Sequence, residues 1–225
     1  VTQNEVKSSG MSDDEIRQLV AESDTGGRRP TGLTEKIVMY TALAWSMFQL
    51  WIASPLPFSL GVFVLNDTQS RSIHLAFAMF LGYMLFPPLK SSPRARIPVQ
   101  DWILGLLGAF CAAYLFLFYA ELAARPGQPT TLDLAVALSG VILLLEGTRR
   151  VVGLPMAIMA AIFLGYIFLG PYMPDMIAHK GASFNKGMTH QWLSTEGVFG
   201  VALGVSSGFV FLFVLFGALL DTGGA

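Results

Sequence analysis

Long apolar runs with almost no charge are the feature that most restricts how this chain can fold. The hydrocarbon core of a bilayer is about 30 Å thick, so a helix that rises about 1.5 Å per residue crosses it with roughly 20 residues. Runs that meet or approach this length are residues 37–53, 72–89, 102–119, 132–145, 152–169 and 197–220. They lack the strict alternation of barrel strands, and only helices and closed barrels satisfy their backbone in lipid. The sequence therefore predicts an all-α, polytopic membrane protein with about six transmembrane helices.

The composition agrees with this class. Of the 225 residues, 53% are hydrophobic and only 13% are charged, whereas about a quarter are charged in an ordinary soluble domain. The single cysteine, Cys111, lies in an apolar run, which predicts a small buried hydrophobic side chain rather than a disulfide or metal ligand. No phosphate-binding glycine loop, nucleophile with a base, or redox motif is found in the sequence. We therefore expect neither an enzyme nor a nucleic-acid partner.

Basic residues are unequally divided between the two sides that alternating spans would create. Lys and Arg are enriched in the cytoplasmic loops of membrane proteins. One side holds eight of them, namely Arg28, Arg29, Lys36, Lys90, Arg94, Arg96, Arg149 and Arg150. The other side holds four, namely Arg71, Arg125, Lys180 and Lys186. This asymmetry predicts a cytoplasmic N-terminus.

The polar tail, residues 1–32, has two interpretations. Ser12 and Glu15 form a capping-box pattern, with Ile16 and Leu19 on one face of a short helix. Because so short a helix is marginal by itself, a largely disordered tail is the favoured interpretation. No small-residue cleavage site follows the first apolar run, so we expect that run to be a span rather than a cleaved signal peptide.

The last apolar run contains small residues at helical spacing. Gly200, Gly204 and Gly208 are predicted to share one helix face, with Ser207 close to it, which favours close packing of a neighbouring helix. The alternative is that Ser206 and Ser207 contact a polar solute or an ion pathway, because hydroxyls in a membrane usually need partners. These five residues are the candidate helix-packing or solute-pathway site.

A second candidate is a charged cluster at the end of the fourth run. Glu146 is followed at i+3 and i+4 by Arg149 and Arg150, so the three charges share a helix face. Anchoring of the cytoplasmic boundary is the favoured interpretation, and a salt bridge to another helix is the alternative. Within the first run, Gln49 is expected to form a hydrogen bond across helices.

The loop between the last two runs is longer than a connector needs to be. Phe184, Met188 and Trp192 recur every four residues after a possible Ser183 cap, which predicts a helix that lies in the membrane interface or packs on the next span.

The three histidines show no metal-ligand spacing. His179 and His190 are eleven residues apart without a carboxylate cluster, and we predict that they, and His74, are solvated. We expect no metal site.

Two blocks of residues resemble a known transporter family. The first is LLEGTRRVVG at residues 144–153, followed by GPY at 170–172 and AHKG at 178–181. The second is STEGVFG at 194–200 with LGVSS at 203–207, continuing into FLFVLFGALL at 211–220. These residues resemble the fused permeases of tripartite ATP-independent periplasmic (TRAP) transporters, in the subclass with a TRAP-associated extracytoplasmic immunogenic (TAXI) receptor. The resemblance covers roughly residues 33–225.

The resemblance implies a domain organisation. Residues 33–150 resemble the four-helix small membrane part, and residues 151–182 a connecting transmembrane helix and loop. Residues 183–225 resemble an interfacial helix and the first helix of the large permease part, which moves as an elevator against a fixed scaffold. The family binds substrate and sodium mainly in later helical hairpins. We therefore expect no cofactor or ion site in this chain, which is interpreted as an N-terminal portion of the permease.

The resemblance also implies a function. The complete transporter would import an organic acid, of the C4-dicarboxylate kind or a related carboxylate, across the bacterial inner membrane by sodium symport. Its expected partners are the lipid bilayer, a periplasmic TAXI-type binding protein and the remainder of the large permease part. The alternative is a membrane scaffold or docking subunit that moves no solute, which fits six spans and a glycine-faced helix equally well.

Overall fold

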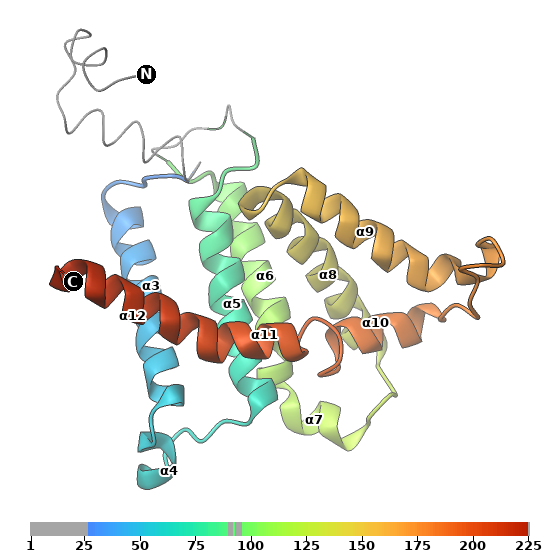
Figure 1. Ribbon diagram of the computed structural model, residues 1–225, viewed down its shortest axis with the longest axis horizontal. Coiled ribbons are helices and arrows are strands. Elements are labelled where there is room, and N and C mark those ends of the chain that lie inside the picture. Colours follow the sequence, from blue (N-terminus) through green and yellow to red (C-terminus); the bar gives the residue numbers. More distant parts are fainter. Residues whose placement is uncertain (1–26, 90–91, 93–95, 225) are drawn as a thin grey trace, which may run out of the picture.

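The computed structural model describes residues 27–89, 92 and 96–224, and among these residues it contains helices and turns but no strand (Figure 1). The all-α prediction is therefore confirmed for this part of the chain. The predicted Ser12 capping box lies outside the described residues. In chain order the helices are α3 (Leu33–Ala53), α4 (Leu56–Leu60), α5 (Asp67–Leu85), α6 (Val99–Leu117), α7 (Tyr119–Ala124), α8 (Thr131–Val151), α9 (Leu154–Leu169), η2 (Gly170–Tyr172), α10 (Phe184–Trp192), α11 (Val201–Val205), η3 (Ser206–Val210) and α12 (Phe211–Gly223).

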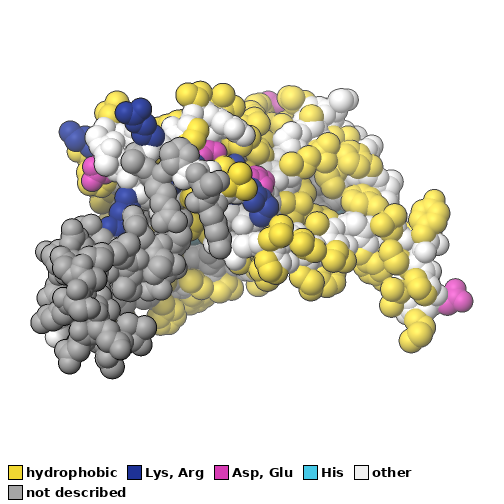
Figure 2. Space-filling model, turned by 90° about the horizontal axis from the view of Figure 1, so that it is seen from above, with side chains coloured by type: hydrophobic (Ala, Val, Ile, Leu, Met, Phe, Trp, Pro, Cys, Tyr) yellow, Lys and Arg dark blue, Asp and Glu magenta, His cyan; other side chains and the backbone are white. Residues whose placement is uncertain are grey.

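Four of these helical segments are long and apolar enough to cross a membrane. They are Val99–Leu117, Thr131–Val151, Leu154–Tyr172 and Val201–Gly223. The helices α3 and α5 have comparable lengths of 21 and 19 residues, but they do not combine that length with the same apolar composition. Many large hydrophobic side chains remain exposed, and Figure 2 shows them over much of the visible surface. Lipid is the solvent that suits such a surface.

The helices α3, α5, α6 and α8 run side by side as a bundle (Figure 1). The helix α5 packs most extensively on α6, where small residues on α6 let the two backbones approach. A Cβ at Gly105 or Gly108 would lie 2.9 Å from the Cε atom of a methionine on α5. Cys111 on α6 is buried, as predicted.

Hydrogen-bonded caps set the beginnings of two bundle helices. Asn66 and Gln69 form a capping box at the start of α5, and Thr130 and Asp133 form one at the start of α8. Each box satisfies backbone N–H groups that have no partner inside the helix. Because α8 begins at Thr131, the fourth apolar run gains the length that it needs to cross a bilayer.

The chain leaves the bundle after α8 through Gly153, whose φ of 118° favours glycine. The helix α9 then diverges from α8, and α10 returns to pack against α8 (Figure 1). Met188 and Trp192 on α10 are buried, whereas Phe184 is about half exposed. The predicted stripe of α10 therefore packs on the bundle rather than lying entirely in the interface.

Candidate functional site

The last three helical segments, α11, η3 and α12, form what we name the C-terminal arm, residues 201–223. The arm crosses obliquely over α3 and α5 instead of running parallel to them (Figure 1). Its central segment η3 is a π-helical turn. Such a turn accommodates an extra residue within an α-helix and is frequent at functional sites. The crossing of the arm over the bundle is therefore a candidate functional site.

Arg71 on α5 holds the beginning of the arm. Its guanidinium donates to the carbonyl oxygens of Phe199, at 3.1 Å, and Gly200, at 3.3 Å, just before α11. The same guanidinium lies against Gly204, where a Cβ would approach the Arg71 Cζ to 2.7 Å. The absence of a side chain at residue 204 is what lets the arginine reach both carbonyls.

A buried polar cluster lies farther along the crossing. Gln49 on α3 donates through Nε2 to the carbonyl oxygen of Ser207, at 2.6 Å, in the π-turn. The same Nε2 lies 2.7 Å from Nδ1 of His74 on α5, and Trp45 Nε1 donates to that Nδ1 at 3.2 Å. Gln49 and His74 are only 3% and 5% exposed. Gln49 therefore links the His74 side chain on α5 to a backbone carbonyl of the arm.

Two sequence predictions are resolved by this cluster. The interhelical hydrogen bond expected of Gln49 is confirmed. The prediction that His74 is solvated is wrong, because its ring is enclosed between α3 and α5. The sequence feature that could have predicted a buried His74 is Trp45. It precedes Gln49 by one helical turn and brings a second N–H donor to the same face of α3.

The five small residues predicted to form one site on the last helix have different surroundings in the structure. Gly204 lies against Arg71, but nothing lies within 4 Å of a Cβ at Gly208. Gly200 precedes the helix as its N-cap, in an extended backbone conformation. The Ser207 hydroxyl donates to the Gly204 carbonyl, at 3.1 Å, within the arm itself. The three glycines therefore do not form one contact face, because the π-turn that begins at Ser206 changes the phase of the helix between residues 204 and 208.

A second cluster lies where α5 and α8 end and α6 begins, and it joins distant parts of the chain. The carboxylate of Asp101 on α6 accepts from Arg28, at 2.5 Å, and from Arg150 on α8, at 2.8 Å. Asp101 is 1% exposed and Arg28 is 3% exposed. Arg28 also donates to the carbonyl oxygens of Tyr83 and Met84 in the last turn of α5. These carbonyls have no partner within the helix, so the arginine caps α5.

The charges predicted on α8 belong to this network. Glu146 accepts from Arg149 through two bonds of 2.7 Å and from Arg150 at 2.8 Å. Arg150 also forms a salt bridge with Asp101 on α6, so the cluster joins α8 to a second helix. The guanidinium of Arg150 further lies 4.6 Å from the centre of the Tyr83 ring. Asp101 was missed because it directly precedes an apolar run, where an acid is usually solvated.

A third polar cluster closes the opposite ends of α6 and α8. Asp133 is completely buried, and it accepts from Arg125, from the Tyr114 hydroxyl at 2.6 Å and from the Thr130 backbone N–H at 2.7 Å. The hydrogen bond to Asp133 raises the pKa of the Arg125 guanidinium above its ordinary value. Arg125 therefore stays charged, and the loop between α7 and α8 is tied to the bundle.

The two remaining histidines are exposed, as predicted, but both have contacts. The ring of His179 lies against Gly170, with Nε2 at 3.0 Å from the Tyr166 carbonyl oxygen, and Nδ1 accepts from Gly181 N–H at 3.0 Å. His190 lies 3.3 Å from Glu196. Within the described part of the chain, no group of three His, Cys, Asp or Glu residues is placed to hold a metal ion.

No match to this chain is found among protein-family models, curated proteins or solved structures.

Proposed function

We propose that this chain is part of the membrane permease of a TRAP-type secondary transporter. In this proposal residues 33–150 form the four-helix small part, and the C-terminal arm is the first helix of the large part. The complete permease imports an organic acid by sodium symport, with the acid delivered by a periplasmic TAXI-type receptor. The motif blocks at residues 144–153 and 194–207 supply the family resemblance that motivates it.

The observation that carries the proposal is the meeting of Gln49, His74 and the Ser207 carbonyl under the arm. Buried polar groups are costly within a membrane and are concentrated where solutes, ions or moving elements are handled. Interrupted helices form the substrate and ion sites of many secondary transporters, where they lie against cavities or other protein rather than lipid. A π-interrupted apolar helix held to a bundle by a few polar bonds suits a part that changes position.

The arm has the packing of an element that can move. None of the residues in its apolar window, within Val201–Gly223, is buried. A displacement of the arm therefore breaks the hydrogen bond from Gln49 to Ser207 but sacrifices little buried apolar area. The orientation belongs to the same proposal: six spans, with a cytoplasmic N-terminus in the bacterial inner membrane, agree with the division of eight basic residues against four.

Uptake by the complete transporter tests this function. The gene is read past the codon for Ala225, and the whole reading frame is purified and reconstituted into proteoliposomes with the binding protein encoded beside it. We expect accumulation of a radiolabelled carboxylate that requires both the binding protein and an inward sodium gradient. Uptake that is equal with potassium in place of sodium would contradict the symport proposal, and no uptake with any carboxylate would contradict the transporter proposal.

A scaffold or docking subunit is the second candidate. The observation in its favour is that buried ion pairs fix both ends of the bundle, through Asp101 at one end and Asp133 at the other. If the complete reading frame moves no solute but co-purifies in a fixed ratio with another membrane protein, the scaffold function replaces transport.

A further inference from the structure

The cluster beneath the C-terminal arm fixes the protonation state of its histidine. Gln49 Nε2 and Trp45 Nε1 are both N–H donors, and both lie against Nδ1 of His74, at 2.7 Å and 3.2 Å. An imidazole nitrogen that accepts hydrogen bonds carries no proton, so the single proton of the neutral ring is on Nε2. The attached arm therefore requires a neutral His74.

The orientation of the Gln49 amide is fixed by the arm. Its Nε2 lies 2.6 Å from the Ser207 carbonyl oxygen, which can only accept a hydrogen bond. A reversed amide would place Oε1 against that oxygen, and two acceptors at this distance repel. One amide nitrogen thus serves His74 and Ser207 at the same time, with one hydrogen for each.

We propose that His74 is a proton-binding site whose occupancy controls the attachment of the C-terminal arm to α3. A proton added to Nδ1 turns this nitrogen into a donor that faces the N–H groups of Trp45 and Gln49. Gln49 then accepts the new proton only if its amide turns Oε1 toward His74. That turn takes Nε2 away from Ser207, so the bond between α3 and the π-turn is lost.

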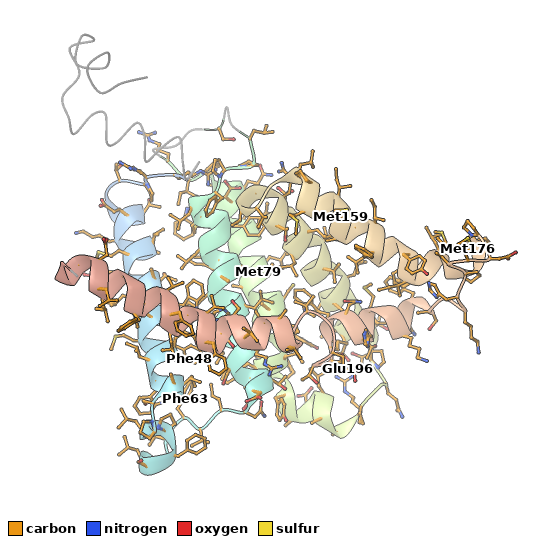
Figure 3. All side chains as sticks on the ribbon, in the orientation of Figure 1. Phe48, Phe63, Met79, Met159, Met176 and Glu196 are labelled. Atoms are coloured by element: carbon orange, nitrogen blue, oxygen red, sulfur yellow. The ribbon has the colours of Figure 1, made fainter. Side chains whose placement is uncertain are left out.

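The surroundings of His74 make the proton the decisive charge at this point. Its ring lies edge-on to Trp45, with centroids 5.0 Å apart, and Trp45 also contacts the rings of Phe77 on α5 and Phe211 on α12. Figure 3 shows the side chains of α3 and α5 at this crossing, with Phe48 labelled. Phe48 in turn contacts Phe77. An apolar aromatic wall of this kind does not screen a new positive charge.

No ion pair of His74 is found among the described residues, whose contacts with its ring are those of Gln49 and Trp45. Arg71, one turn earlier on α5, is held by the carbonyls of Phe199 and Gly200. The segments α11 and η3 contain no charged residue. The helices α3 and α12 contain four further ionisable groups: Glu35 and Lys36 in the first turn of α3, exposed Tyr40 on the same helix, and Asp221 in the last turn of α12. The helices α5 and α6 contain the others, namely Asp67, Tyr83, Asp101, Cys111 and Tyr114. Asp101 and Tyr114 are bound to Arg28 with Arg150 and to Asp133, respectively.

Distance measurements between two spin labels test this inference. Cysteines replace Met47 on α3 and Val214 on α12, which are exposed by 63% and 67%, in a Cys111→Ala background. The labelled protein is placed in lipid nanodiscs, and the distances are measured from about pH 8 to about pH 3, a range that extends well below the ordinary histidine pKa of about 6.5. We expect the short-distance population to fall as pH falls, with about a tenfold shift in the ratio of attached to detached arm for one lost hydrogen bond.

The matched variants are His74→Asn and His179→Asn. In His74→Asn the side-chain oxygen replaces Nδ1 as acceptor but cannot be protonated in this range, so we expect an attached arm at every pH. His179→Asn removes an exposed histidine outside the cluster, and the pH response is expected to remain. Distances that do not change with pH in the parent, or a response that persists in His74→Asn, would overturn the proposal.

A second measurement needs no variant in the cluster. Nitrogen-15 spectra of the labelled histidines report which ring nitrogen carries a proton, and His179→Asn and His190→Asn assign the other two signals. We expect a buried histidine with an unprotonated Nδ1 at high pH that gains a proton there as the arm detaches. A signal with Nδ1 protonated throughout would contradict the proposed site.

Discussion

Gly140 on α8 makes room for the largest fully buried side chain of the described residues. The Trp192 indole from α10 lies where a Cβ at residue 140 would be, and it donates to the Cys111 carbonyl oxygen at 3.0 Å. Gly140→Ala is therefore expected to displace the indole, at a cost of about 1–3 kcal/mol for overpacking. The measurement is the thermal unfolding midpoint in detergent.

Gly165 provides the control for that substitution. It lies within α9, and nothing is found within 4 Å of a Cβ at this position. Gly165→Ala is expected to leave the midpoint unchanged or to raise it slightly, because alanine favours helix. Equal midpoints for the two variants would show that the indole can move without cost.

The Asp101 carboxylate is the shared partner of two buried guanidinium groups. Asp101→Asn leaves Arg28 and Arg150 without their shared carboxylate. We expect a loss of about 3–5 kcal/mol in unfolding free energy, because the buried arginines lose their counter-charge. Denaturant unfolding in mixed micelles measures the effect.

The matched control is Asp67→Asn. Asp67 pairs with Arg71 at 3.4 Å, but its side chain is 90% exposed, and a surface pair of this kind contributes about 0–1 kcal/mol. A loss as small in Asp101→Asn as in Asp67→Asn would mean that water reaches the Asp101 carboxylate.

The C-terminal arm contains two glycines whose surroundings differ sharply. Gly204→Val is expected to push the Arg71 guanidinium off the Phe199 and Gly200 carbonyls, whereas Gly208→Val meets open space. The first variant should increase the reactivity of a cysteine placed at residue 203 with a thiol reagent by several-fold, since the partly buried start of the arm is released. The second should not change it. Equal reactivity in both variants would contradict a role for Arg71 in holding the arm.

The comparison of Gly204 with Gly208 shows how far the sequence could predict this element. The apolar runs and glycine spacing gave the helix and one of its contact residues correctly. They could not predict that Gly208 faces open space. A π-turn has no signature in residue spacing, and it shifts every later residue around the helix axis. Periodicity is reliable only while the helix remains regular.

The bundle shows a related limit. The capping pattern at Thr130 and Asp133 is local and sets the start of α8. The partners of Asp101 are Arg28 and Arg150, which are 73 and 49 residues away along the chain. Nothing in the sequence pairs three such distant charges. For the same reason His74 was predicted to be solvated, although its donors come from another helix.

The sidedness of the whole molecule is open to a direct test. Arg96 and Lys186 are both exposed in the structure and belong to the basic-rich and basic-poor flanks, respectively. In a Cys111→Ala background, we expect a membrane-impermeant maleimide applied to intact cells to label Lys186→Cys, and to label Arg96→Cys only after permeabilisation. The reverse pattern would place the N-terminus outside.

Arg28 contributes to the bundle although it precedes the first described helix. The first described helix begins at Leu33, and a version trimmed to that residue would retain every described helix. It would nevertheless lose the arginine that occupies the end of α5 and neutralises Asp101. Arg28 is thus an integral brace of the bundle, although it lies outside every described helix.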